Sequence, residues 1–238
     1  QQAGTPVLEV SDTYDASTKR YTLSVKQSCP ANPHAAPAER AAQGPPATLP
    51  FHIPLALGLL APDGQNIPLK LEGDAAQAAL SRVLSVKQAE ERFVFMEVPA
   101  KPVPSLARGF SAPVVLKYAY DEASLAHLMA HDPDPFNRWE AGQRLATELI
   151  LRGTQALQTH RAIEVPRAFV AAFARVLGGE GARSDPAFTA EALSLPSEAT
   201  LAEQMDVVDP DSLHQARLQV RLQLAWDLKP ELLDIWRS

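Results

Sequence analysis

The sequence predicts two domains in tandem, an antiparallel β-sandwich of the Ig-like kind over residues 1–118 and an all-α domain over residues 119–238. Short apolar segments that alternate with polar residues fill the first half, whereas apolar residues recur at helical spacing in the second. Fourteen of the 21 prolines lie in the first half. The first half has a net charge of +1 (11 Lys plus Arg, 10 Asp plus Glu), and the second −7 (11 and 18).

Seven segments of the first half are predicted strands, because they are short, rich in apolar and β-branched residues and bounded by turn-forming residues. They are residues 7–10, 21–25, 51–60, 67–71, 82–86, 92–98 and 113–118. Asp63-Gly64 predicts a hairpin turn. Segment 51–60 is apolar almost throughout, which predicts burial on both faces, and Pro54 favours an edge position or a bulge. Residues 29–50, rich in Pro and Ala, predict a mobile surface loop, with a polyproline ligand as the alternative.

The second half predicts five to seven antiparallel helices with short connections. Asp121 should start the first, and the steps Asp134-Pro135, Asp185-Pro186 and Asp209-Pro210 should start three more, since Asp caps a helix that begins with Pro. Pro166 should begin another helix, which Gly178-Gly179 ends. Whether Gly153 ends a helix or lies inside one stays open. The expected apolar positions are Leu125, Leu128, Met129, Phe136, Trp139, Gln143, Leu145, Leu149, Phe169, Val170, Phe173, Val176, Leu177, Leu193, Leu213, Leu218, Leu222, Leu224, Trp226, Leu232, Leu233, Ile235 and Trp236.

Composition excludes several classes of partner. The net charge of −6 argues against nucleic acid. No apolar run reaches the roughly 20 residues that span a bilayer, so no membrane partner is expected. The single cysteine, Cys29, excludes an internal disulfide and fits a reducing compartment, which predicts a cytoplasmic location. We interpret Cys29 as structural, because a reactive thiol needs a nearby base or helix N-terminus.

His127 and His131 have the i, i+4 spacing that places two imidazoles on one helix face, as in His-Glu-x-x-His zinc sites. The position that should hold the general-base Glu is Leu128, however, and no third ligand is evident. We therefore interpret both histidines as lying on the surface or at the end of a helix, where the helix dipole favours a protonated His131.

Two other polar groups have an ordinary structural interpretation. Asp132, Asp134 and Glu140 could together bind a divalent ion, but the Asp-Pro step favours helix capping. Segment 178–181, Gly-Gly-Glu-Gly, follows a helix and lacks the Lys-Ser/Thr ending of a phosphate loop, so it is predicted to be a flexible stop.

Segment 136–140, Phe-Asn-Arg-Trp-Glu, is dense in aromatic and charged residues. It could dock against another domain. The preferred interpretation is burial of Phe136 and Trp139, which are i, i+3 on a helix, with Arg138 and Glu140 in water.

Three segments carry a family resemblance. Gln2-Ala3-Gly4-Thr5-Pro6 resembles the start of the third domain of the aminopeptidase N family, which are zinc exopeptidases. Arg108-Gly109-Phe110-Ser111-Ala112-Pro113-Val114 resembles the closing strand of that domain. Met129-Ala130-His131-Asp132, followed by the segment from Phe136 to Gln143, resembles the opening of the helical fourth domain. The order and spacing agree, and the resemblance covers nearly the whole chain but only the region C-terminal to the catalytic domain of a family member.

The resemblance implies a parent enzyme that removes N-terminal amino acids from peptides with zinc, with the sandwich as a spacer and the helical domain as a lid over the active site. The family's catalytic motifs, His-Glu-x-x-His and Gly-x-Met-Glu-Asn, are both absent; Met96-Glu97-Val98 is the nearest match. No catalytic, cofactor-binding or metal-ligating residue is therefore assigned. We expect an inactive fragment, with a truncated helical domain, whose partners are the missing catalytic domain and the remaining helices. Leu233, Ile235 and Trp236 should lie exposed where those helices pack.

The alternative is a free-standing interaction or ligand-binding module without any link to peptidase activity, since a sandwich fold does not fix function. Sugar-binding sandwiches usually expose aromatic residues on one face, and the first half contains no Trp. A stacked helical repeat is a third possibility, but no fixed period is visible in residues 119–238.

Overall fold

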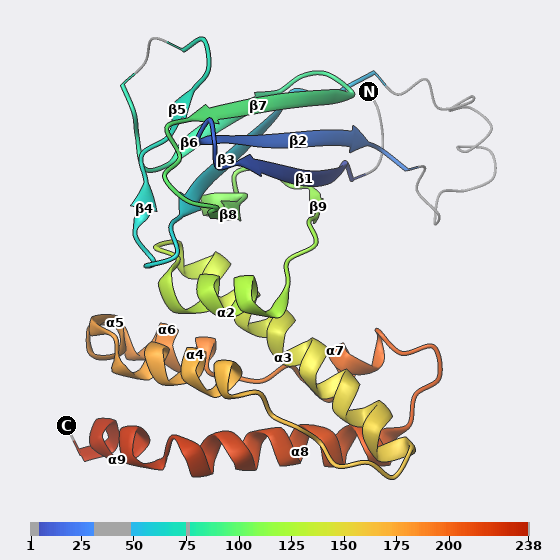
Figure 1. Ribbon diagram of the computed structural model, residues 1–238. Helices are drawn as coiled ribbons and strands as arrows, with labels where there is room; N and C mark the ends of the chain where they lie inside the picture. The colour runs from blue at the N-terminus through green and yellow to red at the C-terminus, as the bar shows by residue number, and fades with distance from the viewer. Residues whose placement is uncertain (1–4, 31–48, 75–76, 238) are drawn as a thin grey trace, which may run out of the picture. The chain divides into compact units, whose positions relative to one another are not determined.

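The computed structural model describes residues 5–30, 49–74 and 77–237, and of Glu180 and Gly181 only the backbone. The chain forms two compact units, a β unit (Gln1–Ala119) and a helical unit (Tyr120–Ser238) (Figure 1). Most of the resemblance at residues 2–6 and most of the expected loop at 29–50 fall outside the described residues.

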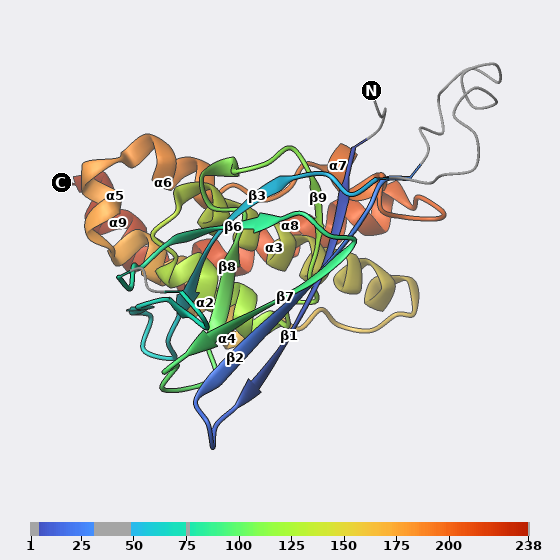
Figure 2. The same cartoon turned by 90° about the horizontal axis from the view of Figure 1, so that it is seen from above.

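Within the described part of the β unit, nine strands form two sheets (Figures 1 and 2). The strands are β1 (Val7–Asp15), β2 (Arg20–Ser28), β3 (Ile53–Leu60), β4 (Asn66–Ile67), β5 (Lys70–Leu71), β6 (Arg82–Val86), β7 (Glu90–Met96), β8 (Val103–Leu106) and β9 (Val115–Lys117). One sheet has the order β5-β7-β2-β1-β9, and the other β4-β3-β6, with β8 also paired to β3. Their pairings are antiparallel except that of β1 with β9, which is parallel.

Alternation of apolar and polar residues explains the sandwich. In β2, Tyr21, Leu23 and Val25 point to one face and are fully buried, while the residues between them are partly exposed. They form one core cluster with alternate residues of β3, such as Leu55 and Leu57, from the other sheet. Burying each such side chain contributes roughly 1.5–3 kcal/mol. The predicted sandwich of two sheets is therefore confirmed.

Two details of the predicted strands are wrong because of proline. Segment 67–71 is divided between β4 and β5, which belong to different sheets. Pro68 lies between them and has no N–H to continue a ladder. Strand β8 was not expected, because Pro102 and Pro104 argued against a strand in this segment. The segment nevertheless pairs with β3 along four residues.

The expected closing strand at Arg108–Val114 is also wrong. Arg108–Phe110 form a 3-10 turn, and Ala107, Gly109 and Phe110 all have positive φ, at 56°, 61° and 52°. A strand cannot continue through three left-handed residues. The chain becomes extended again only at β9.

Pro54 lies in a strand with several neighbours, since β3 pairs with β4, β6 and β8. The pairing with β8 begins at Leu57, so Pro54 has only Ser85 of β6 opposite it. Pro54 itself therefore lies at an edge of the sheet, as expected, but β3 as a whole is not an edge strand. The second half of β3 is buried on both faces, as expected.

The described part of the helical unit contains eight helices (Figure 1). They are α2 (Glu122–His131), α3 (Pro135–Gln158), α4 (Arg167–Gly178), α5 (Glu180–Ser184), α6 (Pro186–Ala192), α7 (Glu198–Ala202), α8 (Pro210–Asp227) and α9 (Lys229–Arg237). Gly153 lies inside α3. None of the helices in the described residues is both long and apolar enough to cross a membrane.

Four aspartates cap helices as the sequence predicts. The side chains of Asp121, Asp134, Asp185 and Asp209 each accept a hydrogen bond from the backbone N–H three residues on, with N···O distances of 2.7, 3.0, 2.9 and 3.1 Å. These bonds satisfy N–H groups that have no partner within the helix. A fifth cap, Ser197, starts α7, which the sequence analysis did not predict.

The apolar face of α8 agrees with the expected one at Leu213 and Leu224 but differs at Leu222 and Trp226. The buried residues are Leu213, Ala216, Val220 and Leu224, which recur every three or four positions. Leu222 and Trp226 lie on the other side of the helix, and Trp226 is 78% exposed. The prediction followed the largest apolar side chains and therefore missed the smaller Ala216 and Val220, which are also buried.

The turn between β1 and β2 predicts a pH dependence. Asp15 accepts hydrogen bonds from the hydroxyls of Ser17 (2.6 Å) and Thr18 (2.7 Å) and from the Ser17 backbone N–H. These bonds lower the pKa of Asp15 from 3.8 to about 2, and the bond from the Ser17 hydroxyl has the largest effect. Because the folded-state pKa is lowered, the stabilisation is present above about pH 4 and is lost as the pH falls through about 2.

We therefore expect Asp15→Asn to lower the urea midpoint at about pH 6 and to have little effect at about pH 2. Urea unfolding of both proteins across this range, followed by circular dichroism, measures the difference. A difference that stays constant with pH would contradict the assignment.

Candidate functional site

His127 and His131 lie next to each other on α2, with ring centroids 4.8 Å apart. His131 is in the last turn of the helix, as expected. Leu128, at the position where the zinc motif has its Glu, is buried in the helical core. No group of three or more His, Cys, Asp or Glu side chains in the described residues lies close enough to hold a metal ion. The donors at hand therefore do not fit a catalytic zinc site.

The acidic residues near the start of α3 have structural contacts. Asp134 caps α3, so the capping interpretation is confirmed for this residue. The Asp132 carboxylate is buried and accepts a hydrogen bond from the Asp134 backbone N–H at 3.0 Å. Glu140 is exposed on α3.

Segment 136–140 differs from the preferred interpretation in two respects. Phe136 is 40% exposed rather than buried, and Arg138 is partly buried rather than in water. Arg138 Nε donates to the Met129 carbonyl at 3.3 Å, and its guanidinium lies 5.6 Å from the ring centre of Phe188. Burial lowers the pKa of Arg138, and the Asp132 carboxylate opposes this shift. Arg138 therefore links α2, α3 and α6 structurally.

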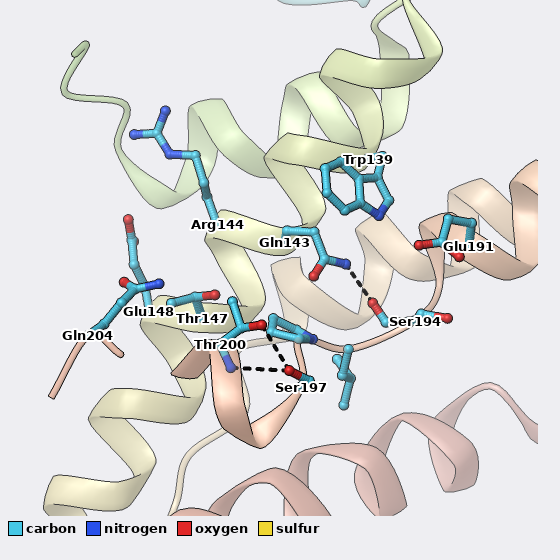
Figure 3. A pocket seen from close by; sticks show the side chains of 12 residues that line it. Trp139, Gln143, Arg144, Thr147, Glu148, Glu191, Ser194, Ser197, Thr200 and Gln204 are labelled. Carbon is cyan, nitrogen blue, oxygen red and sulfur yellow. Dashed lines mark hydrogen bonds between the residues drawn. The ribbon is translucent and has the colours of Figure 1, made fainter. Parts of the chain in front are cut away.

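The helical unit contains a pocket of about 460 Å³ (Figure 3). It lies between α3 and the chain that runs from the end of α6 through α7. Its lining residues are Trp139, Gln143, Arg144, Thr147, Glu148, Glu191, Ser194, Leu195, Pro196, Ser197, Thr200 and Gln204. The volume falls in the range of small-molecule and cofactor sites, about 300–1,000 Å³.

The wall opposite α3 is fixed in place from several sides. Gln143 Nε2 donates to the Ser194 carbonyl at 2.7 Å, and the Ser197 hydroxyl caps Thr200 N at 3.1 Å (Figure 3). From behind, Arg217 of α8 donates to the carbonyls of Pro196 (2.7 Å) and Leu195 (3.4 Å). The pocket is therefore largely preformed, which reduces the cost of ordering a bound ligand.

Two polar groups on the α3 side of the pocket have no hydrogen-bond partner within the described part of the chain. They are the hydroxyl of Thr147, a residue that is 9% exposed, and the buried indole N–H of Trp139. The indole nitrogen of Trp139 is itself buried, and a buried polar group usually has a hydrogen-bond partner. Arg144 is the one cation among the described residues that line the pocket, and its guanidinium lies 5.2 Å from the ring centre of Tyr120.

Comparison with known proteins gives the family. Residues 4–119 match a family model described as a domain of unknown function (DUF3458) with an Ig-like fold, and residues 122–238 match its C-terminal companion (DUF3458_C), described as ARM repeats. Aminopeptidase N of Escherichia coli is 37% identical over 237 residues, which are 100% of this chain and 25% of that protein. The chain belongs to the aminopeptidase N family.

Other family members agree. Aminopeptidase N of Haemophilus influenzae is 33% identical over 235 residues, covering 99% of this chain and 25% of that protein. The Caulobacter vibrioides protein is 37% identical over 170 residues, 71% of this chain and 18% of its own length. The crystal structure of Legionella pneumophila aminopeptidase A in complex with aspartic acid matches with a TM-score of 0.73 and 29% identity, over 98% of this chain and 23% of that one. The chain spans about a quarter of the length of the first two relatives.

These matches confirm the resemblance to the aminopeptidase N family and the Ig-like and helical fold classes. They give no support to the free-standing module. The description of the helical unit as ARM repeats differs from our finding of no fixed period. The helices range from 5 residues in α7 to 24 in α3, and this variation in length hides a repeat from a search for a constant spacing.

No pocket residue was predicted as a binding residue from the sequence. One signal was available, since Trp139, Gln143 and Thr147 are four residues apart and lie on one face of a predicted helix. Gln143 stood out there as a polar residue among expected apolar positions. The second wall, Ser194–Thr200, follows about 50 residues later and gives no sign of being close to α3.

Proposed function

We propose that this chain is a non-catalytic part of a zinc-dependent aminopeptidase that removes N-terminal amino acids from peptides. The observation that carries the proposal is the 37% identity to E. coli aminopeptidase N along the whole chain, over only a quarter of that protein. In this proposal the β unit, about residues 1–118, is a spacer beside a catalytic domain. The helical unit, about residues 119–238, is part of a lid that limits entry to peptides and unfolded chain ends.

The chemistry is proposed to lie outside these residues. Zinc peptidases polarise the scissile carbonyl with the metal and use a glutamate as the base. Of the residues described, His127 and His131 come nearest to such a site, and they lack both a third ligand and the glutamate. We therefore assign no catalytic, cofactor-binding or metal-ligating residue to this chain.

Exposed apolar residues on the last two helices support further helices as partners. Trp226 and Leu222 of α8, and Leu232 and Trp236 of α9, are all exposed, and Trp236 is 81% exposed. Of the residues expected to lie open here, Trp236 does so, while Leu233 and Ile235 are partly buried. Helical repeats bury such faces against the next repeat. The proposal includes a cytoplasmic location and peptides as the substrates of the whole enzyme, with no nucleic acid or membrane partner.

The purified chain should not hydrolyse a chromogenic leucine or alanine anilide, with or without added zinc. The variants His127→Ala and His131→Ala serve as controls for the metal-like pair. Turnover that needs zinc, survives repurification and is lost in either variant would show that this chain holds a catalytic metal site, and the proposal would be wrong.

A further inference from the structure

We propose that the pocket between α3 and Ser194–Thr200 binds an extended peptide segment of about four residues. The first reason is the arrangement of the α3 side chains. Trp139, Gln143 and Thr147 form a row along the helix on the side that faces the opposite wall (Figure 3). These three residues lie on successive turns of the same helix face, because each is four residues from the next.

The spacing of this row matches an extended main chain. Four residues of an α-helix rise about 6 Å, so the row spans about 12 Å from Trp139 to Thr147. An extended peptide rises about 3.3 Å per residue, which gives about 6.6 Å between side chains on the same face. Polar groups of the row can therefore meet every second residue of a peptide that lies along α3.

The chemistry of the row also fits a peptide. A main chain presents donors and acceptors in alternation. The Thr147 hydroxyl can donate or accept a hydrogen bond, and it has no partner among the described residues. Gln143 donates from Nε2 to the Ser194 carbonyl, which leaves its Oε1 as an acceptor. Trp139, Leu195 and Pro196 supply apolar surface for side chains.

A small anion is a poorer fit. Arg144 lies over the ring of Tyr120, and the described lining also contains Glu148 and Glu191, which repel negative charge. A peptide without charged ends avoids this repulsion. The probe is therefore a tetra-alanine peptide with an acetylated N-terminus and an amidated C-terminus.

Fluorescence of Trp139 can report on binding. The chain has three tryptophans, and the other two, Trp226 and Trp236, are exposed on α8 and α9. Replacing both by Phe leaves Trp139 as the single fluorophore. In this background, titration with the peptide up to about 10 mM should give a saturable change, since this range covers a Kd of about 1 mM.

Thr147→Val removes the hydroxyl and keeps the shape, so it should weaken binding about fivefold, the factor expected for one hydrogen bond. Thr147→Ser should restore most of it. Thr13→Val, an exposed threonine of β1, is the matched control and should leave the Kd unchanged. A peptide whose amides are N-methylated should not bind. No saturable change, or an unchanged Kd in Thr147→Val, would overturn the proposal.

The test is independent of the proposed peptidase role. It measures binding by this chain alone and requires no turnover. An absence of binding would leave the family role of the two units intact, and binding would stand even if the whole polypeptide cleaved no peptide.

Discussion

Phe169→Ala is expected to destabilise the helical unit by about 4 kcal/mol, because truncating a fully buried aromatic side chain costs about 3–5 kcal/mol. Phe169 is 2% exposed, and its ring centre lies 4.8 Å from that of Phe173 one turn later on α4. It also borders a cavity of about 220 Å³ among residues of α2, α3 and α4. Removing the ring would enlarge this cavity and lose an aromatic pair that contributes about 0.5–1.5 kcal/mol.

Urea unfolding followed by circular dichroism at helical wavelengths measures this change. Trp226→Ala is the matched control, since it removes a larger aromatic ring from an exposed helix position and should change stability by less than about 0.5 kcal/mol. If the two variants lose similar stability, the packing of α4 described above is wrong.

Gly58→Ala should destabilise the β unit by about 3 kcal/mol, because the added methyl would displace a buried arginine. A Cβ on Gly58 would lie 2.0 Å from Cζ of Arg108, far below any real contact. The guanidinium cannot move without loss, since it donates to Ser105 Oγ (2.7 Å), Asn66 Oδ1 (2.9 Å) and the Leu80 carbonyl (3.2 Å). Arg108 is itself 8% exposed, so these bonds would be broken inside the protein.

A double-mutant cycle isolates the cause. In the background of Arg108→Ala there is space for the methyl, so Gly58→Ala should then cost less than about 1 kcal/mol. Gly178→Ala, where a Cβ meets no atom within 4 Å, controls for the loss of a glycine. Equal costs of Gly58→Ala in both backgrounds would mean that Arg108 does not restrict this position.

The sequence was sufficient to predict those elements whose structure depends only on residues next to each other in the chain. Asp134-Pro135 and Asp209-Pro210 start helices because the capping side chain and the proline lie next to each other in the chain. The Asp63-Gly64 turn follows equally from local conformation, since Gly64 has φ of 86°. Such predictions need no knowledge of what packs against the segment.

The predictions failed where contacts with residues distant in the sequence determine the local structure. β8 forms in spite of Pro104 because β3 supplies pairing partners more than 40 residues earlier. The inward face of α8 includes the small residues Ala216 and Val220, whereas side-chain size favoured Leu222 and Trp226, which are exposed. The pocket depends most on such contacts, because Thr147 can be recognised as a pocket residue only once the wall at Ser194–Thr200 is known to lie opposite it.

The most direct test of the proposed role compares hydrolysis of a leucine anilide by two purified polypeptides, this 238-residue chain and the complete product of the reading frame that encodes it. We expect zinc-dependent hydrolysis by the complete product, with a His-Glu-x-x-His segment outside these residues, and none by the chain alone. A complete product that lacks this segment and hydrolyses no anilide would contradict the proposed role and favour a free-standing binding module.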